Sequence, residues 1–195
     1  MKGLYSCLSN KEKLLGRKLS SSRGDILFHE NDACHYVGLI IKGEIAITSI
    51  SYEGKEVIFN LLHDDDLFGH NLLFSSSPFY KGDVIVKSPS LDLILYKKEE
   101  FISLLSSNKD FLEAYLNKIS DNMKLLNQKV KLLSFSDLEE RFFYYLHYKK
   151  NKIDPLNIST LAKELRCERE TLSRLISKLE KENKILRNGK AIEKA

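Results

Sequence analysis

The sequence predicts an α+β chain with an N-terminal antiparallel β-roll, a long central helix and a C-terminal winged helix-turn-helix. Short β-type runs separated by glycine-containing turns fill residues 24–96. An uninterrupted heptad pattern follows over residues 112–133, and two short amphipathic segments with a tight turn between them occupy residues 157–177. We therefore place the domains at 1–108, 109–133 and 134–195.

The net charge is distributed unevenly along the chain. The 195 residues carry a formal net charge of +4. Residues 1–133 hold 17 Lys and Arg against 17 Asp and Glu, whereas residues 134–195 hold 14 against 10. A neutral first part followed by a basic last part is typical of a sensor joined to a module that binds a polyanion.

Targeting and redox signals are weak. No apolar run reaches the length that spans a bilayer, and the first residues lack the apolar segment of a signal peptide. Cys7, Cys34 and Cys167 are far apart and form no Cys-x-x-Cys pair. We expect a reduced, cytoplasmic protein with no membrane partner.

The predicted roll follows a helical lead-in over about residues 1–20. Its candidate strands are residues 25–28, 36–41, 44–50, 56–62, 83–88 and 91–96. Tyr52-Glu53-Gly54-Lys55 has the composition of a hairpin turn. The interval from Leu62 to Pro78 is too long for a hairpin loop and contains Phe68-Gly69-His70. Insertions of this length usually serve a function.

The long helix carries an apolar seam with steps of four and three residues. The seam consists of Leu112, Leu116, Ile119, Met123, Leu126, Val130 and Leu133. A strict period of 3.5 residues is typical of helices that pair with a copy of themselves. We therefore expect a homodimer rather than a helix that lies on its own β-domain.

The helical pair at residues 157–177 is the most informative segment. The long helix ends at residues 134–137, and a further helix and a linker at residues 151–155 follow. Asn157 or Ser159 is a candidate cap for the first helix of the pair, and Glu168 for the second. A two-stranded wing is expected at residues 185–192, around Asn188-Gly189. This order of elements is that of a winged helix-turn-helix.

The second helix of the pair carries base-reading side chains. Arg169 and Glu170 lie in its first turn, and Arg174 lies five residues after Arg169 on a similar face. In a helix laid in the major groove, N-terminal residues meet base edges. Arg pairs with guanine and Glu accepts from the cytosine amino group. The alternative is a solvated hairpin in which these charges only pair along the helix.

Taken in order, these elements resemble the CRP/FNR regulators over nearly the whole chain. The matching segments are Gly43-Glu44-Ile45, residues 53–56, Phe68-Gly69, residues 167–174 and residues 188–190. The resemblance implies that Arg169, Glu170 and Arg174 contact the bases of TGTGA-like half-sites. It places Ser173 on the recognition helix and Thr171 against a phosphate. Lys163 and Lys178 are further candidates for phosphate contacts.

The resemblance also implies partners and one departure. Two recognition helices of a homodimer would bind double-stranded DNA at a pseudo-palindromic operator, with RNA polymerase as a candidate partner. Arg166 stands where the turn of this family usually has glycine. It is tolerable there if the backbone avoids a left-handed conformation.

The sensor half departs further, with a cyclic-nucleotide-binding-like roll whose pocket is degenerate. Nucleotide binders of the family have Phe-Gly-Glu in the insert, whereas this chain has His70 followed by Asn71. Lys81-Gly82 stands where they have Arg-Ser or Arg-Thr, and Lys lacks the guanidinium fork. Asn127 matches a polar contact to the base. We expect cyclic AMP to bind poorly or not at all, and no resident cofactor.

Other effectors for the sensor half, and an enzymatic function, are alternatives to be weighed. Three scattered cysteines exclude an iron–sulfur cluster. A haem ligated by His70, a redox change at Cys7 or Cys34, an unknown small effector and constitutive activity remain as alternatives. A cupin-like metal enzyme would need clustered ligands on neighbouring strands, and the five histidines show no such motif, nor does a catalytic triad or phosphate loop appear.

Overall fold

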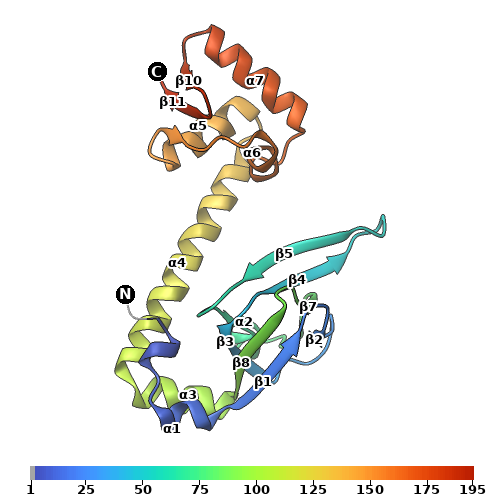
Figure 1. Ribbon diagram of the computed structural model, residues 1–195, viewed down its shortest axis with the longest axis vertical. Helices are drawn as coiled ribbons and strands as arrows, with labels where there is room; N and C mark the ends of the chain where they lie inside the picture. Colours follow the sequence, from blue (N-terminus) through green and yellow to red (C-terminus); the bar gives the residue numbers. More distant parts are fainter. Residues whose placement is uncertain (1–2) are drawn as a thin grey trace. The chain divides into compact units, whose positions relative to one another are not determined.

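The computed structural model describes residues 3–195, which fall into two compact units (Figure 1). The first unit extends to Ile119 and the second comprises Ser120–Ala195. Their border lies inside α4, a helix that covers Lys109–Ser134. Among the described residues, no helix is both long enough and apolar enough to cross a membrane.

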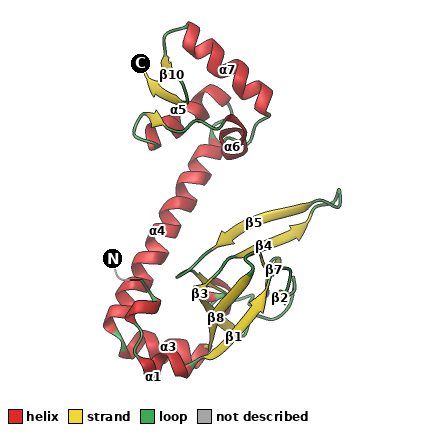
Figure 2. Cartoon of the chain, in the orientation of Figure 1, coloured by secondary structure: helices red, strands yellow, loops and turns green. Residues whose placement is uncertain are grey.

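The N-terminal unit is built from two antiparallel sheets of four strands each. Its strands are drawn in yellow in Figure 2. One sheet has the order β1-β8-β3-β6 and the other β2-β7-β4-β5. The strands are β1 Arg17–Ser22, β2 Ile26–Phe28, β3 Tyr36–Lys42, β4 Ile45–Ile50, β5 Glu56–Leu62, β6 Leu67–Phe68, β7 Asp83–Val86 and β8 Ser90–Lys97. The predicted antiparallel roll is therefore confirmed.

The beginning of the chain differs from its prediction. A 3-10 turn at Tyr5–Cys7 and helix α1, Asn10–Leu15, form the lead-in, and β1 already begins at Arg17. Ser9 is the N-cap residue of α1, because its hydroxyl and the side chain of Glu12 form a reciprocal capping box. Residues 17–20 are therefore a strand paired with β8, where we had expected helix.

The core of the roll lies between the sheets and under the helices that follow. Buried side chains of β3 and β8 include Val37, Leu39 and Leu93, none of which exposes measurable surface. Helix α3, Lys98–Ser107, adds Phe101, whose ring meets that of Phe111 on α4 edge-on at 6.1 Å. Burial of these rings fixes the first turns of α4 against the roll.

The C-terminal unit contains three helices after α4 and a small sheet. The helices are α5 Leu138–Tyr148, α6 Ile158–Glu164 and α7 Arg169–Lys181. The strands are β9 Lys152–Ile153, β10 Ile185–Asn188 and β11 Ala191–Lys194, in the order β10-β11-β9. The predicted wing forms, but it has three strands, because the expected linker at 151–155 contributes β9 through Ile153 paired with Ile192.

All three helices α5, α6 and α7 end in the same way. The residue after each C-cap adopts a left-handed backbone, with φ of 57° at Lys150, 52° at Arg166 and 54° at Asn183. At the end of α6, the Cys167 amide donates to the Ala162 carbonyl at 3.0 Å and the Arg166 amide to Lys163 at 3.3 Å. This paired pattern is a Schellman motif, which usually has glycine at the left-handed position.

Arg166 thus departs from our expectation. We had made its tolerance depend on a backbone that avoids the left-handed region, and the structure places it there. The Schellman hydrogen bonds hold the turn closed in spite of the Cβ of Arg166. The same turn sets the angle at which α7 leaves α6.

Candidate functional site

Helix α7 separates its apolar and polar residues onto two faces. Leu172, Ile176 and Leu179 are buried in the core of the C-terminal unit, at spacings of four and three. Asn157 caps α6 by accepting from the Thr160 amide at 3.1 Å, as expected. Glu168 is the N-cap residue of α7, but its side chain makes no capping hydrogen bond. The opposite face of α7 is left to solvent.

The three predicted base-reading residues lie together on this exposed face. Arg169 and Glu170 occupy the first turn, and Arg174 follows one turn later. An Arg174 guanidinium nitrogen lies 3.8 Å from a Glu170 carboxylate oxygen, and the two side chains are 83% and 87% exposed. An ion pair that is this exposed to solvent contributes little free energy. Both side chains can therefore leave it to contact a ligand.

The other predicted contacts divide into two groups. Thr171 on α7 and Lys163 on α6 are exposed, and Ser173 is half-buried. Lys178, by contrast, is engaged within the protein. Its ammonium lies 3.1 Å from Glu139 at the start of α5 and 3.8 Å from Glu182.

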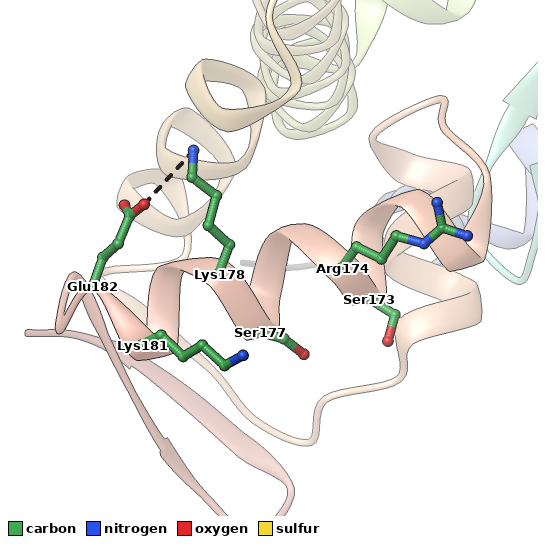
Figure 3. Close-up of a pocket in the computed structure, with 6 residues that line it drawn as sticks. All are labelled: Ser173, Arg174, Ser177, Lys178, Lys181 and Glu182. Atoms are coloured by element: carbon green, nitrogen blue, oxygen red, sulfur yellow. Dashed lines mark ion pairs between the residues drawn. The ribbon is translucent and has the colours of Figure 1, made fainter.

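Lys178 belongs to a charge network that joins α5 to the end of α7. Lys184 binds the same two carboxylates, at 2.7 Å from Glu139 and 2.9 Å from Glu182. Hydrogen bonds from Lys184 and then Lys178 hold the pKa of Glu139 below its usual value. Figure 3 shows Lys178 turned toward Glu182, whereas Lys181 and Ser177 point away from it.

An open hollow of about 520 Å³ runs along α7 beside this network. Its lining includes Arg174 and Lys178 together with Ser177 and Lys181, which sequence reasoning did not single out. The signal was available: positions 170, 173, 174, 177, 178 and 181 recur at the three- and four-residue spacing of one helix face. Lys181 forms no ion pair among the described residues.

The first three predicted sensor residues, Phe68, Gly69 and His70, lie where β6 ends and the next helix begins. Phe68 is buried in the core of the roll, 2% exposed. Gly69 follows with φ of 77°, and a Cβ there would collide with the Tyr36 carbonyl oxygen. Glycine at this position therefore fixes how helix α2, His70–Leu73, begins.

His70 turns inward rather than toward solvent. Its ring lies edge-on to that of Tyr115 on α4, with 6.1 Å between centroids. Its Nδ1 is buried and has no hydrogen-bond partner. Burial lowers the pKa of His70. In the same region Lys118 of α4 forms an ion pair with Asp66 of the insert, so two side-chain contacts join insert and helix.

The remaining sensor residues do not form a common pocket in the roll. Asn71 and Lys81 are exposed. Gly82 is buried so tightly that a Cβ would collide with the carbonyl oxygen of Thr48 on β4. The hydroxyl-bearing residue that nucleotide binders have at this position would therefore displace backbone. Asn127 lies in the C-terminal unit, where it lines an open groove of about 470 Å³ formed by α4 and α5.

Cysteine and metal chemistry receive little support from the side-chain environments. The buried Cys34 thiol lies 3.5 Å from the Tyr36 carbonyl oxygen and 3.6 Å from that of Gly69. Burial raises the pKa of Cys167, and Cys7 is half-buried. Within residues 3–195, no three His, Cys, Asp or Glu side chains are grouped to hold a metal ion.

The seam of α4 is largely uncovered in the single chain. Its middle and final residues expose large apolar fractions: Leu116 52%, Met123 59%, Leu126 61%, Val130 60% and Leu133 48%. Leu112 and Ile119 are half-buried. Contiguous exposed apolar stripes of this kind mark sites that interact with a protein, a membrane or a ligand.

The chain is similar to known regulators along most of its length. The model of the cyclic nucleotide-binding domain matches residues 18–108. The cAMP-activated global transcriptional regulator CRP of Salmonella typhimurium is 28% identical over 177 residues, which cover 85% of this chain and 83% of that protein.

Two solved structures share the fold. The catabolite activator protein of Thermus thermophilus is 19% identical with a TM-score of 0.56, over 98% of this chain and 93% of that one. The c-di-GMP responsive global regulator CLP of Xanthomonas campestris is 18% identical with a TM-score of 0.55, over 93% and 95%. The order of roll, long helix and winged helix-turn-helix agrees with these comparisons, and the chain is similar to CRP-type transcription regulators over most of its length.

Proposed function

We propose that this regulator acts as a homodimer that reads a pseudo-palindromic operator and does not depend on cyclic AMP. Regulators of this family bind DNA and are not enzymes. The observation that carries the proposal is the polar face of α7, where Arg169, Glu170 and Arg174 are exposed to solvent on the side opposite its buried apolar residues. These residue types at these positions suit guanine and cytosine edges in the major groove.

Dimerisation is supported by the exposed seam of α4. Pairing two copies through Met123, Leu126 and Val130 would remove from water the most exposed apolar side chains of this helix. A symmetric pair of this kind presents two recognition helices, as a pseudo-palindromic operator requires. RNA polymerase is a further partner that an activator of this class would contact.

Independence from cyclic AMP is supported by the sensor residues. His70 is turned toward Tyr115, Lys81 is a point charge in solvent, and Gly82 leaves no space for a hydroxyl-bearing side chain. The apo protein would then be active already, or would respond to a different small ligand.

Fluorescence anisotropy on the full chain tests these proposals. A labelled TGTGA-type palindrome and a scrambled duplex are compared at two salt concentrations, with and without cyclic AMP. We expect selective binding without nucleotide. Binding that is selective only with cyclic AMP would refute the sensor interpretation, and equal binding to both duplexes would refute the half-site.

A matched pair of variants separates base reading from phosphate binding. Arg169→Ala should lose about 1–3 kcal/mol of discrimination at one base pair. Lys163→Met, at another exposed cation of the helix-turn-helix, should weaken both duplexes equally and reduce the salt slope by about 1. Uniform weakening by Arg169→Ala would contradict the role given to it.

A further inference from the structure

A third, more enclosed pocket lies within the C-terminal unit, between α4, α5 and α6. It has a volume of about 160 Å³, which suits a molecule with a single ring rather than a drug-sized ligand. Leu125 and Leu132 of α4 supply its aliphatic wall. Three aromatic rings of α5 supply the opposite wall: Tyr144, Tyr145 and Tyr148.

The charged groups at this pocket have an excess of positive charge. Lys129 and Lys149 line it with a single carboxylate, that of Glu164 at the end of α6. The Lys149 ammonium lies 5.6 Å from the ring centroids of both Tyr145 and Tyr148. It is therefore held over the aromatic wall by two cation–π contacts.

The tyrosine hydroxyls are suited to donate hydrogen bonds. A tyrosine hydroxyl is protonated at neutral pH even in water, and burial, followed by the charge of Glu164, raises the pKa of Tyr145 further. A protonated phenol beside a lysine can donate a hydrogen bond to a carboxylate, and because the phenol is uncharged it does not repel that carboxylate.

The pocket faces away from the apolar seam of α4. Its α4 residues are Leu125, Gln128, Lys129 and Leu132, which recur at steps of three, one and three. At roughly 100° per residue, this stripe lies on average more than 90° around the helix from the stripe of Met123, Leu126 and Val130. A dimer formed through the seam would therefore leave the pocket open to solvent.

We propose that this α4–α5–α6 pocket binds a small aromatic carboxylate. The ring of the ligand stacks among Tyr145, Tyr148 and the leucines of α4, and its carboxylate meets the ammonium of Lys149. Such a ligand connects α4 and α5 with α6, the first helix of the helix-turn-helix. Its effect on operator binding rests on the proposed function, but the binding itself does not.

Isothermal titration of the full chain with benzoate tests the site. Benzyl alcohol supplies the ring without the charge, and acetate supplies the charge without the ring. We expect saturable binding of one benzoate per chain with a Kd of about 1 mM or tighter, and at least tenfold weaker binding of both controls. Absence of saturable benzoate binding, or equal binding of acetate, would overturn the proposal.

Variants locate the binding. Lys149→Met should weaken benzoate at least tenfold, and Tyr145→Leu should do so by removing one ring. Lys194→Met, which removes an exposed lysine of β11 that does not line the pocket, is the matched control and should leave the Kd unchanged. Equal loss in the control, or no loss in Lys149→Met, would overturn the assignment.

Operator binding is measured separately by anisotropy, with and without benzoate. Because the titration needs no DNA, a failure of the proposed DNA recognition leaves the calorimetric result intact. Conversely, a protein that reads its operator but takes up no benzoate would refute only the ligand site.

Discussion

Arg166→Gly should stabilise the C-terminal unit, although it removes a side chain from the helix-turn-helix. Arg166 has φ of 52°, in the left-handed region where a Cβ costs about 1–2 kcal/mol. Glycine removes this cost but gains freedom in the unfolded chain, which offsets about 0.4–1 kcal/mol. The difference leaves a net stabilisation of about 0.5–1 kcal/mol.

The Schellman hydrogen bonds of the turn should survive the substitution. They run from the backbone amides of Arg166 and Cys167 to carbonyls of α6 and need no side chain at position 166. Arg166 is exposed and forms no ion pair within the described residues, so its side chain adds little to compensate. Conformational strain should therefore dominate the change.

Urea unfolding followed by far-ultraviolet circular dichroism measures the effect. The midpoint should rise at constant m-value, and a thermal scan should shift upward by about 2–6 °C. Arg166→Ala is the control, because alanine keeps the Cβ and the strain; it should lie within about 0.5 kcal/mol of the parent. A lower midpoint for Arg166→Gly, or an equal gain for Arg166→Ala, would refute the reasoning.

Three further predictions concern other parts of the chain. Burial lowers the pKa of His70, so the unfolded state binds more protons below pH 6.5, and stability should fall as the pH decreases from that value; His70→Gln should flatten this part of a pH–stability curve, and an unchanged curve would contradict it. Leu126→Glu, which introduces a charge into the exposed seam, should shift sedimentation toward a monomer, whereas Glu113→Gln, off the seam on the same helix, should not. Lys181→Met should lower the salt slope of DNA binding by about 1 without loss of stability. Lys178→Met should lower the unfolding midpoint, because it leaves Glu139 with one fewer cation. A lower salt slope for Lys178→Met with an unchanged midpoint would show instead that Lys178 faces the phosphates.

Periodicity in the sequence was enough to predict the main elements of this protein. Short β-type runs separated by glycine-containing turns predicted the roll, because strands of this length and spacing pair into antiparallel sheets. The heptad steps from Leu112 to Leu133 predicted α4, whose bounds are Lys109–Ser134. The charged positions of α7 followed from helical spacing alone, since Arg169, Glu170 and Arg174 are local to one another in the chain.

Tertiary structure decided what depends on residues far apart in sequence. β9 forms only because Ile153 meets Ile192, a pairing that a short segment between helices does not reveal. Its position on α7 predicts that Lys178 contacts a phosphate, and only the folded chain reveals that its ammonium also pairs with Glu139, 39 residues away in the sequence. Gly82 looks like a lost hydroxyl in the sequence, whereas the carbonyl of Thr48 explains why no side chain fits. Helix and strand propensity and the pattern of apolar residues depend on residues that are close in the sequence. Ion pairs, strand partners and steric limits arise only when the folded chain brings distant residues into contact.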